Sequence, residues 1–307
     1  MAGSDRLSAA VLAGTRGEAV GSAVLSKNRG RLALFGPGYC GTAIAKGAEA
    51  AGYAVVTVGR TEPALLSDAT HLLSTVPPGE DGDPVLARLG DRIAAAAGLR
   101  WIGYLSTTGV YGDHGGAWVD ETTPPAPISD RSLRRLAAEQ AWLAAGAGRP
   151  VDIFRLAGIY GPGRSALDEL RAGRARRIDK PGHVFGRVHR DDIVAAVLAA
   201  MAQDRAPGPR ILNLSDDEPS EPQAVTAEAA RLLGLPPPPL VPFATAWEQM
   251  SPMARTFWAE NRRVCSTATK AALGISWRYA TYREGLRAIL AQNLGQRRAE
   301  QGEVGGT

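Results

Sequence analysis

The stretch RLALFGPGYCG, from Arg31 to Gly41, constrains the fold of this chain more than any other feature. Leu32 to Phe35 form an apolar run with the length of a buried parallel strand. Three glycines follow at once in G-x-G-x-x-G spacing, and the small residues from Thr42 to Ala51 predict a helix. The sequence therefore predicts a strand–turn–helix unit at the start of an α/β fold.

Each glycine of the turn has a separate structural role in such a unit. Gly36 permits the tight turn, Gly38 lets backbone approach a pyrophosphate, and Gly41 brings helix and strand together. The helix N-terminus adds free N–H groups and a partial positive charge. The unit predicts a dinucleotide site, although a glycine turn in another kind of α/β protein has the same spacing.

Composition excludes several classes of protein. The 307 residues are 45% hydrophobic and 21% charged, which is ordinary for a globular chain with one core or one core and a lobe. Two cysteines, Cys40 and Cys265, indicate neither a disulfide framework nor a metal site, and they favour the cytoplasm. A formal charge of +4 does not indicate nucleic acid, and the longest apolar run, Ile193 to Ala202, is too short for a membrane span.

Apolar runs and helical patterns alternate along the chain after the glycine turn. This alternation predicts an α/β fold with a doubly wound, Rossmann-like parallel sheet covered on both faces. The expected strands are 54–58, 71–76, 100–105, 151–156 and 210–214, and the expected helices are 42–51, 83–97, 131–145 and 191–202.

A change in composition marks the predicted domains. Residues 1–30 are expected to be a flexible leader, and 31–160 the dinucleotide-binding domain, to which 188–215 return. Gly and Pro become frequent after residue 160, so 161–187 and 216–295 are expected to form a smaller substrate lobe. Its predicted helices are Thr245–Glu260 and Thr281–Asn293, and the polar tail 296–307 is expected to be disordered.

Arg60 follows the second expected strand, where a dinucleotide fold holds the adenosine ribose. An acidic residue there would bind the 2′-hydroxyl of NAD, whereas an arginine can bind the 2′-phosphate of NADP. The sequence thus favours NADP, with NAD possible, and a solvated surface arginine is the alternative reading.

Five further motifs resemble the extended short-chain dehydrogenase/reductase family, which includes the NAD-dependent epimerases and dehydratases. They are STTGVYGD (106–113), VDETTPP (119–125), RLAGIYGPGR (155–164), VHRDDI (188–193) and ILNLSDDEP (211–219). With the glycine turn, in this order, the resemblance covers roughly residues 31–290. It implies a Rossmann domain, a C-terminal substrate lobe, hydride transfer to or from a small molecule, and a homodimer.

The resemblance also implies roles for single residues. Thr107 matches the catalytic Ser/Thr that binds a substrate oxygen, and a strand-end threonine that caps a turn is the alternative. Tyr111 matches the V-Y-G turn, where it either packs or supplies a proton. Arg164 and His189 match positions that face the substrate. The expected cofactor contacts are Gly36, Pro37, Gly38, Tyr39, Cys40, Gly41, Arg60, Thr75, Val76, Pro77, Ser106, Arg135, Ala157, Gly158 and Ile159.

The chain departs from the family pattern at two places. Members carry a catalytic Y-x-x-x-K pair, but alignment on LAAE (136–139) puts Arg131 at the tyrosine and Arg135 at the lysine. Arginine stays protonated, so Arg131 cannot transfer the proton. The connection 61–70 is also too short for the helix and strand that members place there.

Three functions follow from this pattern. The favoured one is an NADP-dependent oxidoreductase of an atypical extended short-chain type, acting on a carbonyl or alcohol substrate. The alternative is a catalytically silent NADP-binding sensor. A sugar-nucleotide epimerase or dehydratase comes third, because it also needs the missing proton-transfer group.

Overall fold

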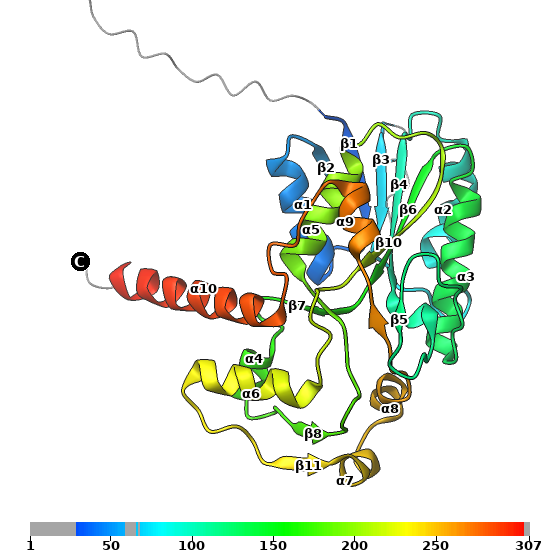
Figure 1. Cartoon of the computed structure of the whole chain (residues 1–307). Coiled ribbons are helices and arrows are strands. Elements are labelled where there is room, and N and C mark those ends of the chain that lie inside the picture. The colour runs from blue at the N-terminus through cyan, green and yellow to red at the C-terminus, as the bar shows by residue number, and fades with distance from the viewer. Residues whose placement is uncertain (1–28, 59–65, 67, 304–307) are drawn as a thin grey trace, which may run out of the picture.

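A single parallel sheet organises the structure, a computed structural model that describes residues 29–58, 66 and 68–303 (Figure 1). Its six strands lie in the order β10-β6-β4-β3-β1-β2. The central strands are apolar along their whole length, because helices cover both faces of the sheet. The strands are β1 Arg31–Phe35, β2 Ala54–Val58, β3 His71–Ser74, β4 Trp101–Thr107, β6 Pro150–Leu156 and β10 Gly208–Leu214.

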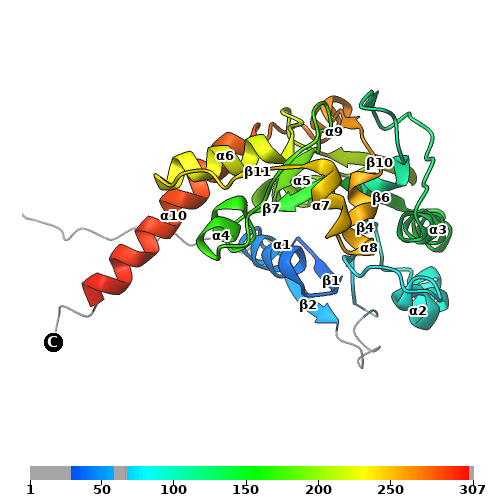
Figure 2. The same ribbon diagram turned by 90° about the horizontal axis from the view of Figure 1, so that it is seen from below.

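Two layers of helices sandwich the sheet (Figure 2). On one face Ile44 and Val197 belong to a buried core, and on the other Leu89 and Trp142 belong to a second one. The first layer consists of α1 Tyr39–Ala50, α5 Arg190–Met201 and α9 Thr267–Leu273, and the second of α2 Pro84–Ala95 and α3 Asp130–Ala145. The doubly wound architecture expected from the sequence is confirmed.

Strand β2 is the edge of the sheet among the described residues. This agrees with the expectation that the connection after β2 omits a helix and a strand. Arg60 and most of that connection (59–65 and 67) lie outside the described residues, as does nearly all of the expected leader, 1–28.

A smaller set of elements lies below the carboxyl edge of the sheet in Figure 1. It contains short strand pairs, β7 with β9 and β8 with β11, and helices between them. A third pair, β12 with β5, lies beside β4. These elements are β5 Trp118–Val119, β7 Gly158–Tyr160, β8 Arg177–Asp179, β9 Arg187–His189, β11 Leu240–Pro242, β12 Arg263–Val264, α4 Ala166–Arg171, α6 Pro222–Leu233, α7 Phe243–Glu248, α8 Pro252–Trp258 and α10 Tyr282–Glu303.

The single helix predicted over Thr245–Glu260 is wrong, because the chain forms α7 and α8 with a break between them. Pro252 disfavours helical geometry at the residue before it, and it suits the first position of a new helix. The Ser251 side chain accepts the Ala254 N–H at 3.2 Å and caps α8.

The prediction of a disordered tail over 296–307 is also wrong for most of that range. Helix α10 continues to Glu303, and QRRAEQ (296–301) consists of residues with good helix propensity. Helix α9, which falls in the range expected for the lobe, instead packs on the sheet through Leu273.

Candidate functional site

The glycine turn has the geometry that its spacing predicts. Gly36 adopts φ +84°, and the Thr75 hydroxyl donates to its carbonyl at 2.5 Å. A β-carbon at Gly41 would collide with the Gly36 carbonyl, so helix α1 packs directly on the turn. A β-carbon at Gly38 would meet no atom within 4 Å. Two glycines thus serve the fold, and Gly38 faces open space.

Helix α1 begins directly after this open position. Gly38 is its N-cap residue, and no side chain caps the helix. The first N–H groups of a helix need partners from outside it, and the helix dipole favours an anion there. The turn therefore fits the pyrophosphate of a dinucleotide.

A cavity of about 590 Å³ starts at this turn and extends between the sheet and the lobe. Its walls come from α1, the carboxyl ends of β4 and β6, the N-terminal half of α3, strand β9, and the α8 region. It brings together these predicted site residues: Gly38, Tyr39, Cys40, Thr75, Ser106, Thr107, Arg135, Ala157, Gly158, Ile159 and Arg164.

The other predicted cofactor contacts do not line this cavity. Gly36, Pro37 and Gly41 form the turn behind Gly38, and Val76 and Pro77 follow Thr75 outside the lining. Arg60 lies outside the described residues.

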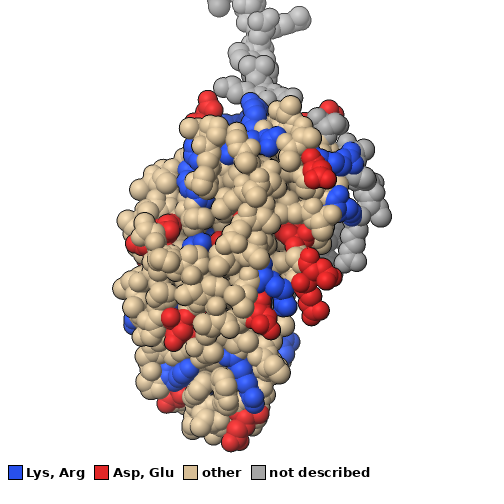
Figure 3. All heavy atoms as spheres, turned by 90° about the vertical axis from the view of Figure 1, so that its right-hand side faces the viewer, with Lys and Arg blue, Asp and Glu red and all other residues tan. Residues whose placement is uncertain are grey.

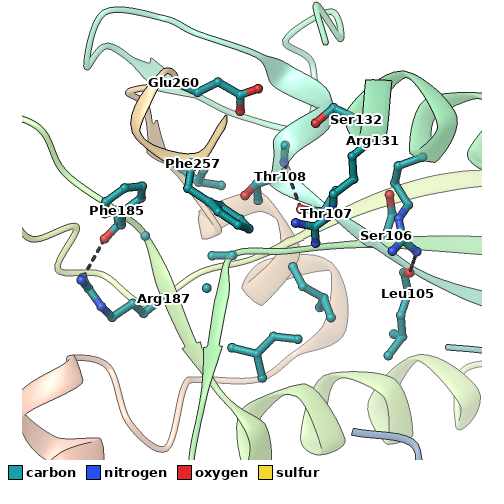
Figure 4. A pocket seen from close by; sticks show the side chains of 18 of the residues that line it. Leu105, Ser106, Thr107, Thr108, Arg131, Ser132, Phe185, Arg187, Phe257 and Glu260 are labelled. Carbon is teal, nitrogen blue, oxygen red and sulfur yellow. Dashed lines mark hydrogen bonds between the residues drawn. The ribbon is translucent and has the colours of Figure 1, made fainter. Parts of the chain in front are cut away.

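Thr107 is the last residue of β4, and its side chain lines the cavity (Figure 4). Its Oγ1 accepts the Gly109 N–H at 3.1 Å, which caps the following 3₁₀ turn Thr108–Tyr111. A hydroxyl that accepts this bond keeps its own proton available for a ligand oxygen. Capping and ligand binding are thus compatible at this residue.

The hydroxyl of the neighbouring Ser106 is hydrogen-bonded to a buried ion pair. Its hydroxyl donates to Glu139 Oε1 at 2.5 Å, and Arg155 donates to both oxygens of the same carboxylate at 2.8 and 3.2 Å. The two charged side chains are 3% and 5% exposed. Because Glu139 and Arg155 neutralise each other and Ser106 donates to the same carboxylate, these groups stabilise the structure beside the cavity. Neither charge is available to a ligand.

Two predicted site residues lie elsewhere. Tyr111 is fully buried, its hydroxyl donates to Asn213 Oδ1 at 2.8 Å, and burial raises its pKa. His189 caps α5 by accepting the Asp191 N–H at 3.1 Å, and burial lowers its pKa to about 4. Neither residue lines the cavity. The structure thus agrees with the packed alternative for Tyr111 and gives His189 a capping role at α5, and the predicted roles of both toward a substrate stay predictions.

The cavity is strongly cationic, which sequence reasoning did not anticipate. Among the residues that line it, five are arginines (Arg131, Arg135, Arg164, Arg187 and Arg262) and one is a carboxylate, Glu260. Glu260 forms an ion pair with Arg262 at 2.6 Å. The four other guanidinium groups form no ion pair with any described carboxylate.

Arg131 and Arg135 lie one helical turn apart on α3 and both line the cavity. Figure 4 shows Arg131 near Thr107. Arg135 donates to the Tyr104 hydroxyl at 2.9 Å and the Leu105 carbonyl at 3.0 Å, both uncharged. Arg131 lies 5.2 Å from the centre of the Phe257 ring, and burial together with Arg135 lowers its pKa. Phe257 comes from α8, and no motif in the sequence marks it.

Parts of this chain match known proteins in sequence. The profile of the NAD dependent epimerase/dehydratase family matches residues 87–215. Protein YeeZ from Escherichia coli K12 is 33% identical over 178 residues, which cover 56% of this chain and 62% of YeeZ. The 3-diazoavenalumate denitrifying reductase of a Streptomyces species is 29% identical over 204 residues, covering 63% of this chain and 66% of the reductase. The matched part thus spans less than two thirds of either relative.

Solved structures show the same fold. A functionally unknown conserved protein from Silicibacter pomeroyi is 46% identical, with a TM-score of 0.81 over 86% of this chain and 99% of its own. MoeE5, solved with UDP-glucuronic acid and NAD, is 20% identical, with a TM-score of 0.69 over 84% and 97% of the two chains. Human epimerase family protein SDR39U1, solved with NADPH, is 17% identical, with a TM-score of 0.67 over 84% and 98%.

Residues 87–215 thus form a domain that matches the NAD-dependent epimerase/dehydratase family. The six-stranded parallel sheet is that of the similar NAD-binding structures. None of the helices in the described residues combines the length and apolar character that crossing a membrane requires.

Proposed function

We propose that this protein is an NADP(H)-dependent oxidoreductase that interconverts a carbonyl and an alcohol on a small molecule. One observation carries the proposal: the uncapped N-terminus of α1 at Gly38 and the Thr107 hydroxyl line the same cavity. The first suits a dinucleotide pyrophosphate and the second suits a reacting oxygen. The reductase among the relatives and the NAD and NADPH complexes among the similar folds support the same chemistry.

The bound nicotinamide would supply or accept the hydride. Thr107 would donate a hydrogen bond to the substrate oxygen on which negative charge develops, and Arg131 would add a fixed positive charge nearby. Because a guanidinium does not release its proton, the proton would come from water or from the substrate. The placement of Arg131 and Arg135 on α3 supports the proposal that they replace the tyrosine and lysine of the family.

The test of this function is NADPH oxidation with a panel of aldehydes and ketones. Thr107→Ala should lower kcat by about 10²–10³-fold, since it removes one oxyanion donor. Thr107→Ser keeps the hydroxyl and is the matched control, with a rate near that of wild type. Tight NADPH binding without turnover of any substrate would refute the proposal in favour of a catalytically silent sensor.

The preference for NADP rests on Arg60. A charge-assisted contact with the 2′-phosphate is worth about 1.5–3 kcal/mol, or roughly tenfold to a hundredfold in affinity. Titration of wild type and Arg60→Ala with NADPH and NADH measures it, and equal wild-type affinities for both would contradict the assignment.

We also propose a homodimer that pairs through α2 and α3. Leu133 on α3 is 50% exposed, and the view onto this side of the molecule shows acidic and basic groups interspersed among uncharged surface (Figure 3). Light scattering tests the proposal, and a monomeric mass at micromolar concentration would contradict it.

A further inference from the structure

A second cavity, of about 360 Å³, lies beside the first in the lobe. Arg164, Arg187 and Tyr160 line both cavities, so they form the wall between them. The rest of the second cavity comes mainly from α4, α6 and α10. Pro222, Val225 and Leu286 make part of it apolar, and its one carboxylate, Glu169, forms an ion pair with Arg174 at 2.9 Å. The boundary is therefore the place where cationic groups meet a partly apolar compartment.

Arg187 is held at this boundary by one nitrogen. Its Nη1 donates to the Phe185 carbonyl at 2.9 Å and to the Ser220 carbonyl at 3.2 Å. Its Nε and Nη2 have no hydrogen-bond partner among the described residues. In Arg155 and in Arg210, the corresponding Nε and Nη2 both donate to one carboxylate. Arg187 thus presents a fixed and unfilled carboxylate-binding edge.

No described carboxylate forms an ion pair with this guanidinium, and burial raises the pKa of the neighbouring Asp216 to about 8, so that carboxyl is uncharged at neutral pH. Asp216 lies beside it, but Asp216 Oδ1 accepts the backbone N–H of Arg187 at 3.4 Å. Arg164, the second cation of the shared wall, contacts the Tyr39 ring at 5.7 Å and has no carboxylate partner among the described residues. A half-buried cation without an ion-pair partner is costly for the free protein, and an anionic ligand at the guanidinium reduces that cost.

Tyr282 supplies an independent observation. It is 1% exposed and lines the second cavity, its hydroxyl has no hydrogen-bond partner among the described residues, and the Arg187 guanidinium lies 5.9 Å from its ring centre. Buried hydroxyls nearly always find a partner. A carboxylate at Arg187 would offer this hydroxyl an acceptor.

We infer that the substrate is an oxo acid or the matching hydroxy acid, with its carboxylate bound by Arg187, Arg164 and Tyr282 at the boundary of the two cavities. This inference rests on the proposed function and names its substrate class. The reacting carbonyl lies at Thr107 in the first cavity, and the hydrocarbon part of the acid contacts the apolar wall.

The test is calorimetric binding of straight-chain oxo acids and of their methyl esters to the full chain with NADP⁺ present. Wild type should bind the best acid more tightly than its ester. Arg187→Gln should weaken the acid by about tenfold to a hundredfold and leave the ester unchanged. Arg176→Gln, at an exposed arginine of the same lobe, is the charge-matched control and should change neither ligand.

Tyr282→Phe keeps the inference testable if Arg187→Gln does not fold. It removes only a hydroxyl that has no hydrogen-bond partner in the part of the chain that the structure describes, and it should weaken binding of the acid severalfold at unchanged thermal stability. Equal binding of acid and ester by wild type would overturn the inference. So would tighter binding of an alkyl phosphate of the same length, which would assign the site to phosphate.

The outcomes separate this inference from the proposed function. Turnover of neutral ketones with no preference for acids would refute the oxo-acid assignment alone. Acid binding that depends on Arg187, without NADPH oxidation, would refute the proposed oxidoreductase alone.

Discussion

Two arginines beside the main cavity, Arg155 on the sheet side and Arg187 on the lobe side, differ in how their charge is paired. On the sheet side, the buried Arg155 is closed off by Glu139 at 2.8 Å, with both side chains at most 5% exposed. On the lobe side, Arg187 donates only to neutral carbonyls. An arginine whose Nε and Nη2 both donate to a buried carboxylate stabilises the fold. An arginine whose Nε and Nη2 have no partner among the described residues is available to a ligand. The Arg155–Glu139 pair is thus a completed part of the scaffold, whereas Arg187 on the lobe side is left available to a ligand.

The largest expected effect of this difference is on stability. Arg155→Met leaves the Glu139 carboxylate buried without its cation, and such a loss costs about 3–5 kcal/mol. Arg187→Gln removes no ion pair and should cost much less. Urea unfolding of both variants measures the contrast, and equal losses of unfolding free energy would break the comparison.

A smaller effect is expected at Tyr111, which belongs to the scaffold. Tyr111→Phe leaves the buried Asn213 acceptor without its donor, at a cost of about 1–3 kcal/mol. The rate of NADPH oxidation should stay at the wild-type value, because the hydroxyl does not reach the cavity. A large drop in kcat with unchanged stability would show that the tyrosine takes part in the chemistry.

The smallest expected effect is a pH dependence on the lobe side. Burial raises the pKa of Asp216 to about 8, so this carboxyl is protonated and uncharged below that pH. Above it, the new carboxylate competes for Arg187, and oxo-acid affinity should fall severalfold. Asp216→Asn cannot ionise and should bind the acid equally on both sides of pH 8. The same fall in wild type and variant would locate the titrating group elsewhere.

The sheet and its first helix could be predicted from the sequence, because local features of the sequence determine them. The glycine spacing, the apolar runs and the short connection after β2 predicted the strand–turn–helix unit and the edge position of β2. The alignment on LAAE also identified Arg131 and Arg135, which line the cavity. Their one-turn spacing puts both on one face of α3.

The lobe could not be predicted to the same depth. Arg187 and Phe257 come from β9 and α8, and only the tertiary fold brings them to the cavity. His189 and Tyr111 lie in recognisable motifs, but burial and internal hydrogen bonds, which no motif encodes, take their side chains away from the cavity. Helix α6 was not predicted, although the residues after Pro222 are mostly good helix formers. The break before Pro252 was missed because the predicted helix was continued through a proline that favours the start of a new one.

The central claim is that the open turn at Gly38 binds a nicotinamide dinucleotide. Calorimetric titration of NADPH into wild type, Gly38→Val and Gly90→Val tests it most directly. Gly90 is a fair control, because it lies outside the cavity and a β-carbon there, as at Gly38, meets no atom within 4 Å. We predict that Gly38→Val folds normally but binds NADPH at least about a hundredfold more weakly, a loss of roughly 2.7 kcal/mol, while Gly90→Val binds as wild type does. Unchanged NADPH affinity in a folded Gly38→Val protein would contradict the account.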